Sequence, residues 1–258
     1  MLKNQHIHLE QLRIYEIQYI LSLKELKSYS TKCKVLEIGA GSGWQSKVFH
    51  EYGYQIKAID IASSIYRKNK VWDILPYDGK KIPFSDNFFD IIYSSNVLEH
   101  ISHLDQFQQE IHRVLKPNGK VIHLVPTASW RLWTNLTHYP GIFMIITSKI
   151  KTKLMHKTQN KQIKLKIFKS KKKYSLFSII SPKGHGERGN AISELYYFSK
   201  WCWSSLFKRN NWNIQRYTTN KLFYTGYSIL NHRLPIGMRK WLSFFLGSSC
   251  HIFILNKK

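Results

Sequence analysis

A glycine-rich turn follows a short apolar segment at residues 33–43, which read CKVLEIGAGSG. The apolar part, Val35–Ile38, has the length and composition of a buried parallel strand. Three glycines in the next five residues allow a tight turn and a close approach of the backbone to a ligand. Residues 44–49 can begin a helix. This order of strand, turn and helix predicts an open α/β sheet with a ligand site at the carboxyl end of the strand.

An acidic residue inside this strand narrows the choice of ligand. The turn lacks the G-x-G-x-x-G spacing of a dinucleotide-binding loop and the G-K-[ST] of a phosphate-binding loop. A carboxylate beside it would repel phosphate and attract a cation. The E-x-G-x-G-x-G pattern resembles motif I of class I S-adenosylmethionine (SAM) dependent methyltransferases, whose cofactor carries a sulfonium and an ammonium group. This resemblance implies cofactor contacts at Glu37, Gly39, Ala40, Gly41 and Gly43.

Two further acids occupy positions that suit a nucleoside. Asp60 ends the second alternating segment, where an acid can accept both ribose hydroxyls, as it also does in NAD enzymes. Asp78 lies five residues before the proline of an Ile-Pro-Phe turn, in a segment that resembles the adenine-binding part of the same methyltransferases. By that resemblance Asp78 accepts from the adenine amino group and Gly79 completes the contact, although Asp78-Gly79 also suits a plain turn. The resemblance adds Ile61 and Asn96 to the cofactor-binding set.

The later motifs extend the resemblance over residues 33–126. The runs V-L-E-H-I and R-V-L-K-P-N-G-K are similar to those of small-molecule and glycan-directed SAM methyltransferases. The implied fold is a Rossmann-like three-layer α/β sandwich with a seven-stranded, mostly parallel sheet in the order 3-2-1-4-5-7-6 and an insertion after the fifth strand. Beyond the first two strands, we expect strands at Val71–Leu75, Phe89–Tyr93, Val121–Val125, Trp212–Asn220 and His251–Asn256. We expect one methyltransferase domain over residues 1–258, with leading helices at 1–30, the SAM-binding core at 33–126, a basic acceptor region at 127–200, and closing helices and strands at 201–258.

Positive charge is concentrated in the second half of the chain. The formal net charge is +25, and residues 131–258 hold 24 Lys and Arg against 2 Asp and Glu, whereas residues 1–130 hold 16 against 13. Eleven lysines and no acid lie between Lys149 and Lys173. Compositional drift would raise lysine everywhere, so we favour a functional field that attracts an anionic substrate, anionic lipid or nucleic acid. We expect peripheral contact of the tract Lys149–Lys173 with an anionic membrane, or its use for an anionic substrate.

The cysteines and the hydropathy pattern bear on location. Three widely spaced cysteines argue against a disulfide framework and indicate a reducing compartment. The first 20 residues contain no continuous apolar region of the kind a signal peptide has, and no run of 18 apolar residues suggests a spanning helix. We therefore expect a cytoplasmic protein, with peripheral attachment to the cytoplasmic membrane face as an added hypothesis.

The residues after the fourth strand bear on the chemistry. Asn96 is followed by Val-Leu, without the Pro-Pro-aromatic sequence typical of enzymes that methylate exocyclic amines. Glu99 and His100 could ligate a metal together with His103. We favour packing and capping roles for these side chains and predict no metal site.

A glycine-rich loop supplies candidates for a general base. His185 and Glu187 lie in the sequence G-H-G-E-R-G, where histidine can titrate near neutral pH and the glycines permit close approach to a substrate. His100 is the third catalytic candidate. A solvated loop histidine is the alternative for His185. The segment H-G…N…E-L-Y-Y-F is similar to methyltransferases encoded with bacterial surface-polysaccharide genes.

These observations favour SAM-dependent methylation of a hydroxyl. The expected acceptor is a sugar or a lipid-linked glycan precursor. The basic second half leaves an RNA or DNA methyltransferase as an alternative, with nucleic acid the less favoured partner. A SAM-binding protein without catalysis is the other alternative.

Overall fold

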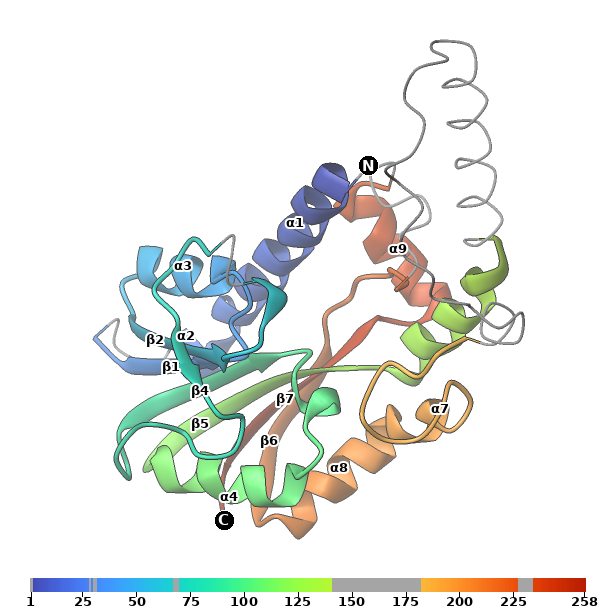
Figure 1. The fold of residues 1–258 in the computed structure, drawn as a ribbon. Helices are drawn as coiled ribbons and strands as arrows, with labels where there is room; N and C mark the ends of the chain where they lie inside the picture. Colours follow the sequence, from blue (N-terminus) through green and yellow to red (C-terminus); the bar gives the residue numbers. More distant parts are fainter. Residues whose placement is uncertain (1, 28, 30–31, 67–69, 141–181, 227–233) are drawn as a thin grey trace, which may run out of the picture.

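The strands of the protein form one seven-stranded sheet in the order β3-β2-β1-β4-β5-β7-β6 (Figure 1). The computed structural model describes residues 2–27, 29, 32–66, 70–140, 182–226 and 234–258. The strands are β1 (Lys34–Ile38), β2 (Gln55–Ile61), β3 (Leu75–Tyr77), β4 (Phe89–Ser95), β5 (Leu115–Pro126), β6 (Trp212–Thr219) and β7 (Cys250–Lys257). β7 runs antiparallel to both of its neighbours, and the remaining pairs are parallel. The predicted Rossmann-like sheet and its strand order are confirmed.

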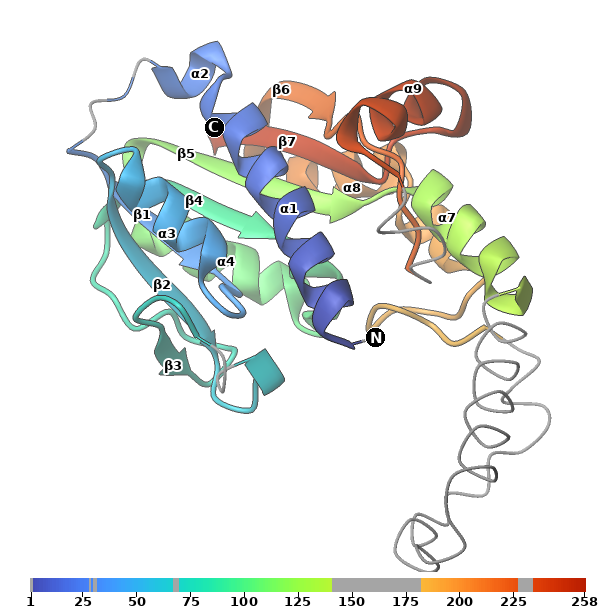
Figure 2. The same cartoon turned by 90° about the horizontal axis from the view of Figure 1, so that it is seen from above.

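Helices cover both faces of the sheet. They are α1 (Leu2–Leu21), α2 (Lys24–Lys27), α3 (Trp44–Glu51), the 3-10 turn η2 (Leu98–His100), α4 (Leu104–Val114), α7 (Glu194–Tyr197), α8 (Lys200–Arg209) and α9 (Ile236–Leu246), with a further helix at residues 128–140. α1 and α3 lie side by side over one face (Figure 2), and α4 and α8 cover the other (Figure 1).

Alternation along the central strands builds the two halves of the core. In β5, Val121 and Val125 pack with the α4 and α8 side chains, whereas Ile122 and Leu124 pack with those of α1 and α3. Successive side chains of a strand point to opposite faces, so a strand covered on both sides must be apolar at almost every position. This explains why the strand segments read as continuous apolar runs.

The third strand lies later than the sequence indicates. We predicted it at Val71–Leu75, but β3 is Leu75–Tyr77 and pairs in parallel with the end of β2. β3 contains Pro76 and is the edge strand of the sheet, the position where proline is tolerated because one row of backbone groups needs no partner strand. The proline and the weak alternation before it made this boundary difficult to predict.

The sheet topology creates a crevice at the carboxyl ends of its central strands. β1 lies between β2 and β4. From β1 the chain adds β2 and then β3 on one side of β1, and it then returns to place β4 on the opposite side of β1. Ligands of open α/β sheets bind at such a reversal of strand order. The glycine turn after β1 and the segment after β4 both lie there. The lysine tract Lys149–Lys173 lies outside the described residues.

Candidate active site

The glycine turn joins β1 to α3. Gly39, Gly41 and Gly43 all have positive φ, at 69°, 60° and 87°. A Cβ atom at Gly39 would collide with the side chain of Val97, and one at Gly43 would collide with Trp72. Because other residues rarely adopt this conformation, glycine is required both for the turn and for the space around it. The turn therefore packs closely while its backbone borders the crevice.

Asp60 lies at the end of β2, where the sequence predicts a ribose-binding acid. Its Oδ2 accepts a hydrogen bond from Gly41 N at 3.1 Å, and its Oδ1 accepts one from Ile61 N at 2.8 Å. These two bonds fix the carboxylate against the glycine turn. An ionised carboxylate has about four acceptor sites, so it retains capacity for two ribose hydroxyls.

Asp78 and Gly79 form a turn after β3. Asp78 Oδ1 accepts hydrogen bonds from Lys80 N at 2.8 Å and Lys81 N at 2.9 Å. These backbone bonds lower the pKa of Asp78 below its usual value, so the group stays ionised. Both bonds use Oδ1, which is compatible with acceptance of an adenine amino group by Oδ2. Asp78-Gly79 can therefore form the turn and contact the cofactor at the same time.

A cleft of about 700 Å³ connects these elements. Its volume falls in the range of about 300–1,000 Å³ found for small-molecule sites. Seven of the ten predicted cofactor-binding residues line it: Gly39, Gly41, Asp60, Ile61, Asp78, Gly79 and Asn96. The acidic groups lie at the ends of β2 and β3, and the other wall comes from the segment after β4. His100 and His103 belong to that second wall.

Three predicted cofactor contacts do not line the cleft: Glu37, Ala40 and Gly43. Glu37 is buried, and its carboxylate accepts a hydrogen bond from Ser46 Oγ of α3. Burial is the main cause that raises the pKa of Glu37 to about 8. In this position Glu37 ties β1 to the first turn of α3 and supports the glycine turn from behind. A direct contact of Glu37 with the cofactor stays a prediction.

The raised pKa of Glu37 gives an expected pH dependence of stability. Between pH 4.5 and about pH 8 the folded protein holds a proton on Glu37 that the unfolded chain has lost. The folded state then binds more protons, so the contribution of Glu37 to the free energy of unfolding falls as pH rises through this window. Denaturant unfolding at several pH values should show a shallower fall for Glu37→Gln than for the wild type. If the free energy of unfolding of Glu37→Gln falls with pH as steeply as that of the wild type, Glu37 does not carry the raised pKa.

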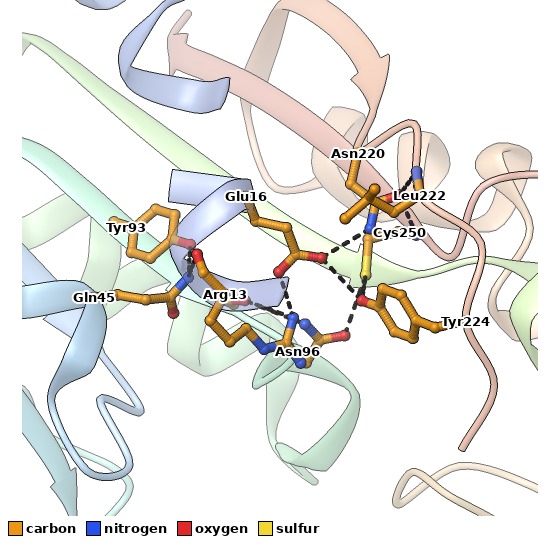
Figure 3. Close-up of polar contacts among 10 residues, drawn as sticks. Arg13, Glu16, Gln45, Tyr93, Asn96, Asn220, Leu222, Tyr224 and Cys250 are labelled. Atoms are coloured by element: carbon orange, nitrogen blue, oxygen red, sulfur yellow. Dashed lines mark hydrogen bonds and ion pairs between the residues drawn. The ribbon is translucent and has the colours of Figure 1, made fainter. Parts of the chain in front are cut away.

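Asn96 is held in the cleft wall by α1 (Figure 3). With its amide oriented to satisfy its neighbours, Asn96 Oδ1 accepts from Arg13 Nη1 at 2.7 Å and from Nη2 at 3.0 Å. The residue has a positive φ of 54°, which asparagine tolerates better than most residues. The leading helix therefore shapes the cleft by fixing one of its lining side chains.

Behind Arg13 lies a buried polar network that the sequence analysis missed (Figure 3). Glu16 is fully buried and pairs with Arg13 at 2.6 Å. Its Oε1 also accepts hydrogen bonds from Asn220 Nδ2 at 2.8 Å and from Tyr224 OH at 2.9 Å. The network joins α1 to the segment after β6, 204 residues later in the chain. The local signal is an Arg and a Glu three residues apart, which does not distinguish them from the other polar residues of the helix.

His185, the main candidate base, lies next to His100 and Glu99. The Nε2 atoms of His185 and His100 are each 3.8 Å from Glu99 Oε1, and the two imidazole rings are 4.8 Å apart. Trp130 packs against the His185 ring at 4.7 Å. His100 also lines the cofactor cleft. Two of the three predicted catalytic residues thus come together beside the cleft, joined by Glu99.

The loop that carries His185 is anchored by backbone hydrogen bonds. Glu194 Oε1 accepts from His185 N at 2.7 Å and from Gly186 N at 2.8 Å, and its Oε2 lies 2.8 Å from Arg131 Nε. Glu187 N donates to the backbone carbonyl of Glu99 at 2.8 Å, while the Glu187 residue is exposed. The buried Arg131–Glu194 pair thus positions the loop. A general-base role for the Glu187 side chain stays a prediction.

Comparison with known proteins gives the class of this core. Residues 36–123 match the family model described as a methyltransferase domain. Over these residues the chain is similar to a methyltransferase domain of the SAM-dependent class. A SAM-dependent methyltransferase from Mesorhizobium loti has a similar fold, with a TM-score of 0.50 and 12% identity over 88% of this chain and 91% of that one.

Two curated relatives match the methyltransferase domain but not the rest of the chain. One is a ubiquinone/menaquinone biosynthesis C-methyltransferase from Cupriavidus taiwanensis, 33% identical over 38% of this chain and 45% of the relative. The other is a malonyl-[acyl-carrier protein] O-methyltransferase from Erwinia billingiae, 31% identical over 38% of this chain and 42% of the relative. The chain thus spans less than half the length of these relatives, and they differ in the atom that they methylate.

The residues of the cleft fit the cofactor of this family, SAM. Gly41 lines the cleft, and because it has no side chain the backbone of the turn is open there to a bound ligand. Asp60 would hold the ribose hydroxyls, and Asp78 would hold the adenine amino group. When bound, SAM supplies a methyl group on a positively charged sulfur. The acidic side chains and glycines that line the cleft therefore agree with the SAM-binding motifs of the sequence.

Proposed function

We propose that this protein transfers a methyl group from SAM to a hydroxyl of a sugar or a lipid-linked glycan precursor. One observation carries the proposal. His100 lies both in the wall of the cofactor cleft and in the group formed with Glu99 and His185. Groups that can assist loss of a hydroxyl proton are thus placed beside the site that suits SAM.

The residues of the site have separate tasks in this reaction. Methyl transfer is an in-line displacement, so it depends on holding the acceptor oxygen close to the methyl carbon and on excluding water. The new O–C bond forms as the C–S bond breaks, and the acceptor hydroxyl loses its proton. Asp60 and Asp78 position the nucleoside, and the group of Glu99, His100 and His185 assists removal of the proton.

The acceptor class rests on the second half of the chain. The loop and helix that carry His185 and Glu194 resemble methyltransferases encoded with surface-polysaccharide genes, and this resemblance supports an acceptor bound beside them. The named acceptors of the two curated relatives differ from each other and from a sugar. An RNA or DNA acceptor is the alternative that the charge of residues 131–258 favours, and salt-sensitive binding to generic RNA would support it.

The acceptor can be identified by mass spectrometry of cell extracts. Glycan and lipid fractions from cells with the active protein would be compared with fractions from cells that carry an Asp60→Ala variant. We expect one glycan or lipid-linked species to gain the mass of a CH₂ group only with the active protein. The same mass gain confined to RNA or DNA would replace the glycan acceptor with a nucleic acid.

Asp60→Ala is expected to weaken binding of SAM and of S-adenosylhomocysteine by about 1.5–3 kcal/mol, the scale for losing hydrogen bonds to a charged group. The carboxylate is fixed by Gly41 N and Ile61 N, so its loss removes both the ribose contact and a support of the turn. Isothermal titration calorimetry would measure the change. Asp73→Ala is the matched control, because Asp73 is exposed and lies outside the cleft. Equal affinity in Asp60→Ala and wild type would remove Asp60 from the site.

We also propose that the protein attaches peripherally to the cytoplasmic face of a membrane through α9. The helix exposes Phe244 at 84%, Trp241 at 63% and Phe245 at 63% of their surface. An exposed apolar helix face in a chain of net charge +25 suits anionic lipid, whereas a second copy of the same charge would be repelled. No helix of the described part of the chain is long and apolar enough to cross a bilayer. The lysine tract Lys149–Lys173 would add about 1 kcal/mol for each lysine close to the surface.

Vesicle co-sedimentation tests this attachment. We expect the wild type to bind vesicles that contain anionic lipid and to lose binding steeply with added salt. Replacing Trp241 and Phe244 with serine should release the protein, because their apolar surface would no longer enter the interface. Trp201→Ser is the control, since Trp201 is equally exposed, at 66%, but lies on α8. Release by the control variant to the same extent, or equal binding to neutral vesicles, would contradict the α9 proposal.

A further inference from the structure

Glu99 differs from the other buried glutamates of the described residues. Glu16, Glu37 and Glu194 each accept at least one hydrogen bond from a side chain or from the backbone. The Glu99 side chain is 0% exposed, and neither of its carboxylate oxygens has a hydrogen-bond donor among the described residues. A buried carboxylate without donors is unfavourable unless a positive charge compensates it. Glu16 and Glu194 are also paired with arginines, at 2.6 and 2.8 Å, whereas no described lysine or arginine pairs with Glu99.

The two groups nearest this carboxylate are imidazoles. His100 Nε2 and His185 Nε2 each lie 3.8 Å from Glu99 Oε1, and one ligand atom from each of the three residues lies within 4.8 Å of the others. When two ligand atoms bind one cation at about 2.0–2.2 Å each, they lie up to about 4 Å from each other. Small side-chain movements would therefore bring the three ligand atoms to bonding distance of one ion. Two histidines and one carboxylate form a common ligand set for divalent transition metals.

We propose that Glu99, His100 and His185 bind one divalent transition-metal cation at the edge of the cofactor cleft. The sequence predicts no metal site and offers His103 as the third ligand of the alternative. In the structure His103 occupies the N-cap position of α4 and lines the cleft, and His185 takes that third place. The bonds of Glu194 to the loop and of Glu187 N to the Glu99 carbonyl bring His185 there from 85 residues away. The ligand set is therefore formed by tertiary structure.

The position of this site suggests its role, which rests on the proposed function. Both histidines are partly exposed, so three protein ligands leave open positions for an acceptor oxygen on the side of the cleft. A hydroxyl bound to a divalent cation loses its proton more readily. The proton would pass to solvent as the oxygen forms its bond to the methyl carbon and the C–S electron pair stays on sulfur. Binding of the cation itself is independent of this role.

Calorimetry on protein freed of metal with a chelator tests the site, using Zn²⁺ alone and Mn²⁺ alone as probes. We expect the wild type to bind one equivalent of at least one of these ions. Glu99→Gln and His185→Ala should each weaken that binding by at least about tenfold, since second-shell changes alone cost 10–100-fold. His103→Ala is the matched control and should bind like wild type. No binding by the wild type, or equal binding by all four proteins, would overturn the site.

Thermal unfolding supplies a second readout. Without metal, Glu99→Gln should be at least as stable as wild type, because an uncompensated buried carboxylate is replaced by a neutral amide. Zn²⁺ should raise the melting temperature of wild type more than that of Glu99→Gln. An equal rise in both proteins would contradict the proposal. If Glu99→Gln fails to fold, His185→Ala carries the same test, because His185 lies on a surface loop.

S-adenosylhomocysteine titrations separate this inference from the proposed function. A wild type that binds S-adenosylhomocysteine but neither ion overturns the cation site alone, and His185 then acts directly on the acceptor proton. A wild type that binds an ion but no S-adenosylhomocysteine overturns the methyltransferase proposal and leaves the cation site standing.

Discussion

Replacing Glu16 with alanine is expected to lower the free energy of unfolding by about 3–5 kcal/mol, the scale for removing one partner of a buried ion pair. Glu16 is fully buried, and the change would leave Arg13, Asn220 and Tyr224 without their shared acceptor. It would also loosen Arg13, which holds Asn96 in the cleft wall. Denaturant unfolding followed by circular dichroism measures the change.

Glu51→Ala is the control for this prediction. Glu51 lies on α3 and pairs with Lys47 at 4.0 Å, but both side chains are about half exposed. Exposed pairs contribute about 0–1 kcal/mol. A loss of stability from Glu16→Ala no greater than that from Glu51→Ala would show that the network in Figure 3 does not hold α1 to the C-terminal part of the sheet.

His185→Ala is expected to lower turnover by roughly 10²-fold or more, because a positioned group that assists proton transfer contributes about 10²–10⁴-fold. The affinity for SAM should remain nearly unchanged, since His185 does not line the cofactor cleft. Steady-state kinetics with the identified acceptor, together with calorimetry for SAM, measures both quantities.

The control for His185 is another exposed histidine. His50 lies on α3 and packs at a tilt against Trp72, outside the cofactor cleft. We expect His50→Ala to retain full turnover. Full turnover in His185→Ala would return His185 to the role of a solvated loop residue, despite its position beside Glu99 and His100.

The cofactor side of the site could be predicted because it depends on local sequence. The turn after β1 needs glycines at Gly39, Gly41 and Gly43, and the acid at Asp60 ends a strand whose alternation is plain in the sequence. The hydrophobic runs of the central strands likewise gave their positions and, through the family resemblance, their order. These features require no knowledge of contacts between distant segments.

The remaining features depend on residues far apart in the chain. The network of Glu16 with Asn220 and Tyr224 joins segments more than 200 residues apart. The contact of His185 with Glu99 depends on the buried pair of Arg131 and Glu194. No periodicity or spacing reports such pairs, because each partner alone looks like an ordinary polar residue. Sequence reasoning therefore identified His185 and His100 as separate candidates but not the group they form with Glu99.

Titration of S-adenosylhomocysteine into the folded wild-type protein tests the central claim most directly. The structure offers a cleft of about 700 Å³ with Asp60 and Asp78 at the ends of adjacent strands. We predict saturable binding of one S-adenosylhomocysteine per chain by isothermal titration calorimetry, with SAM competing for the same site. Folded protein that binds neither compound would contradict the assignment of this cleft to SAM and, with it, the proposed methyl transfer.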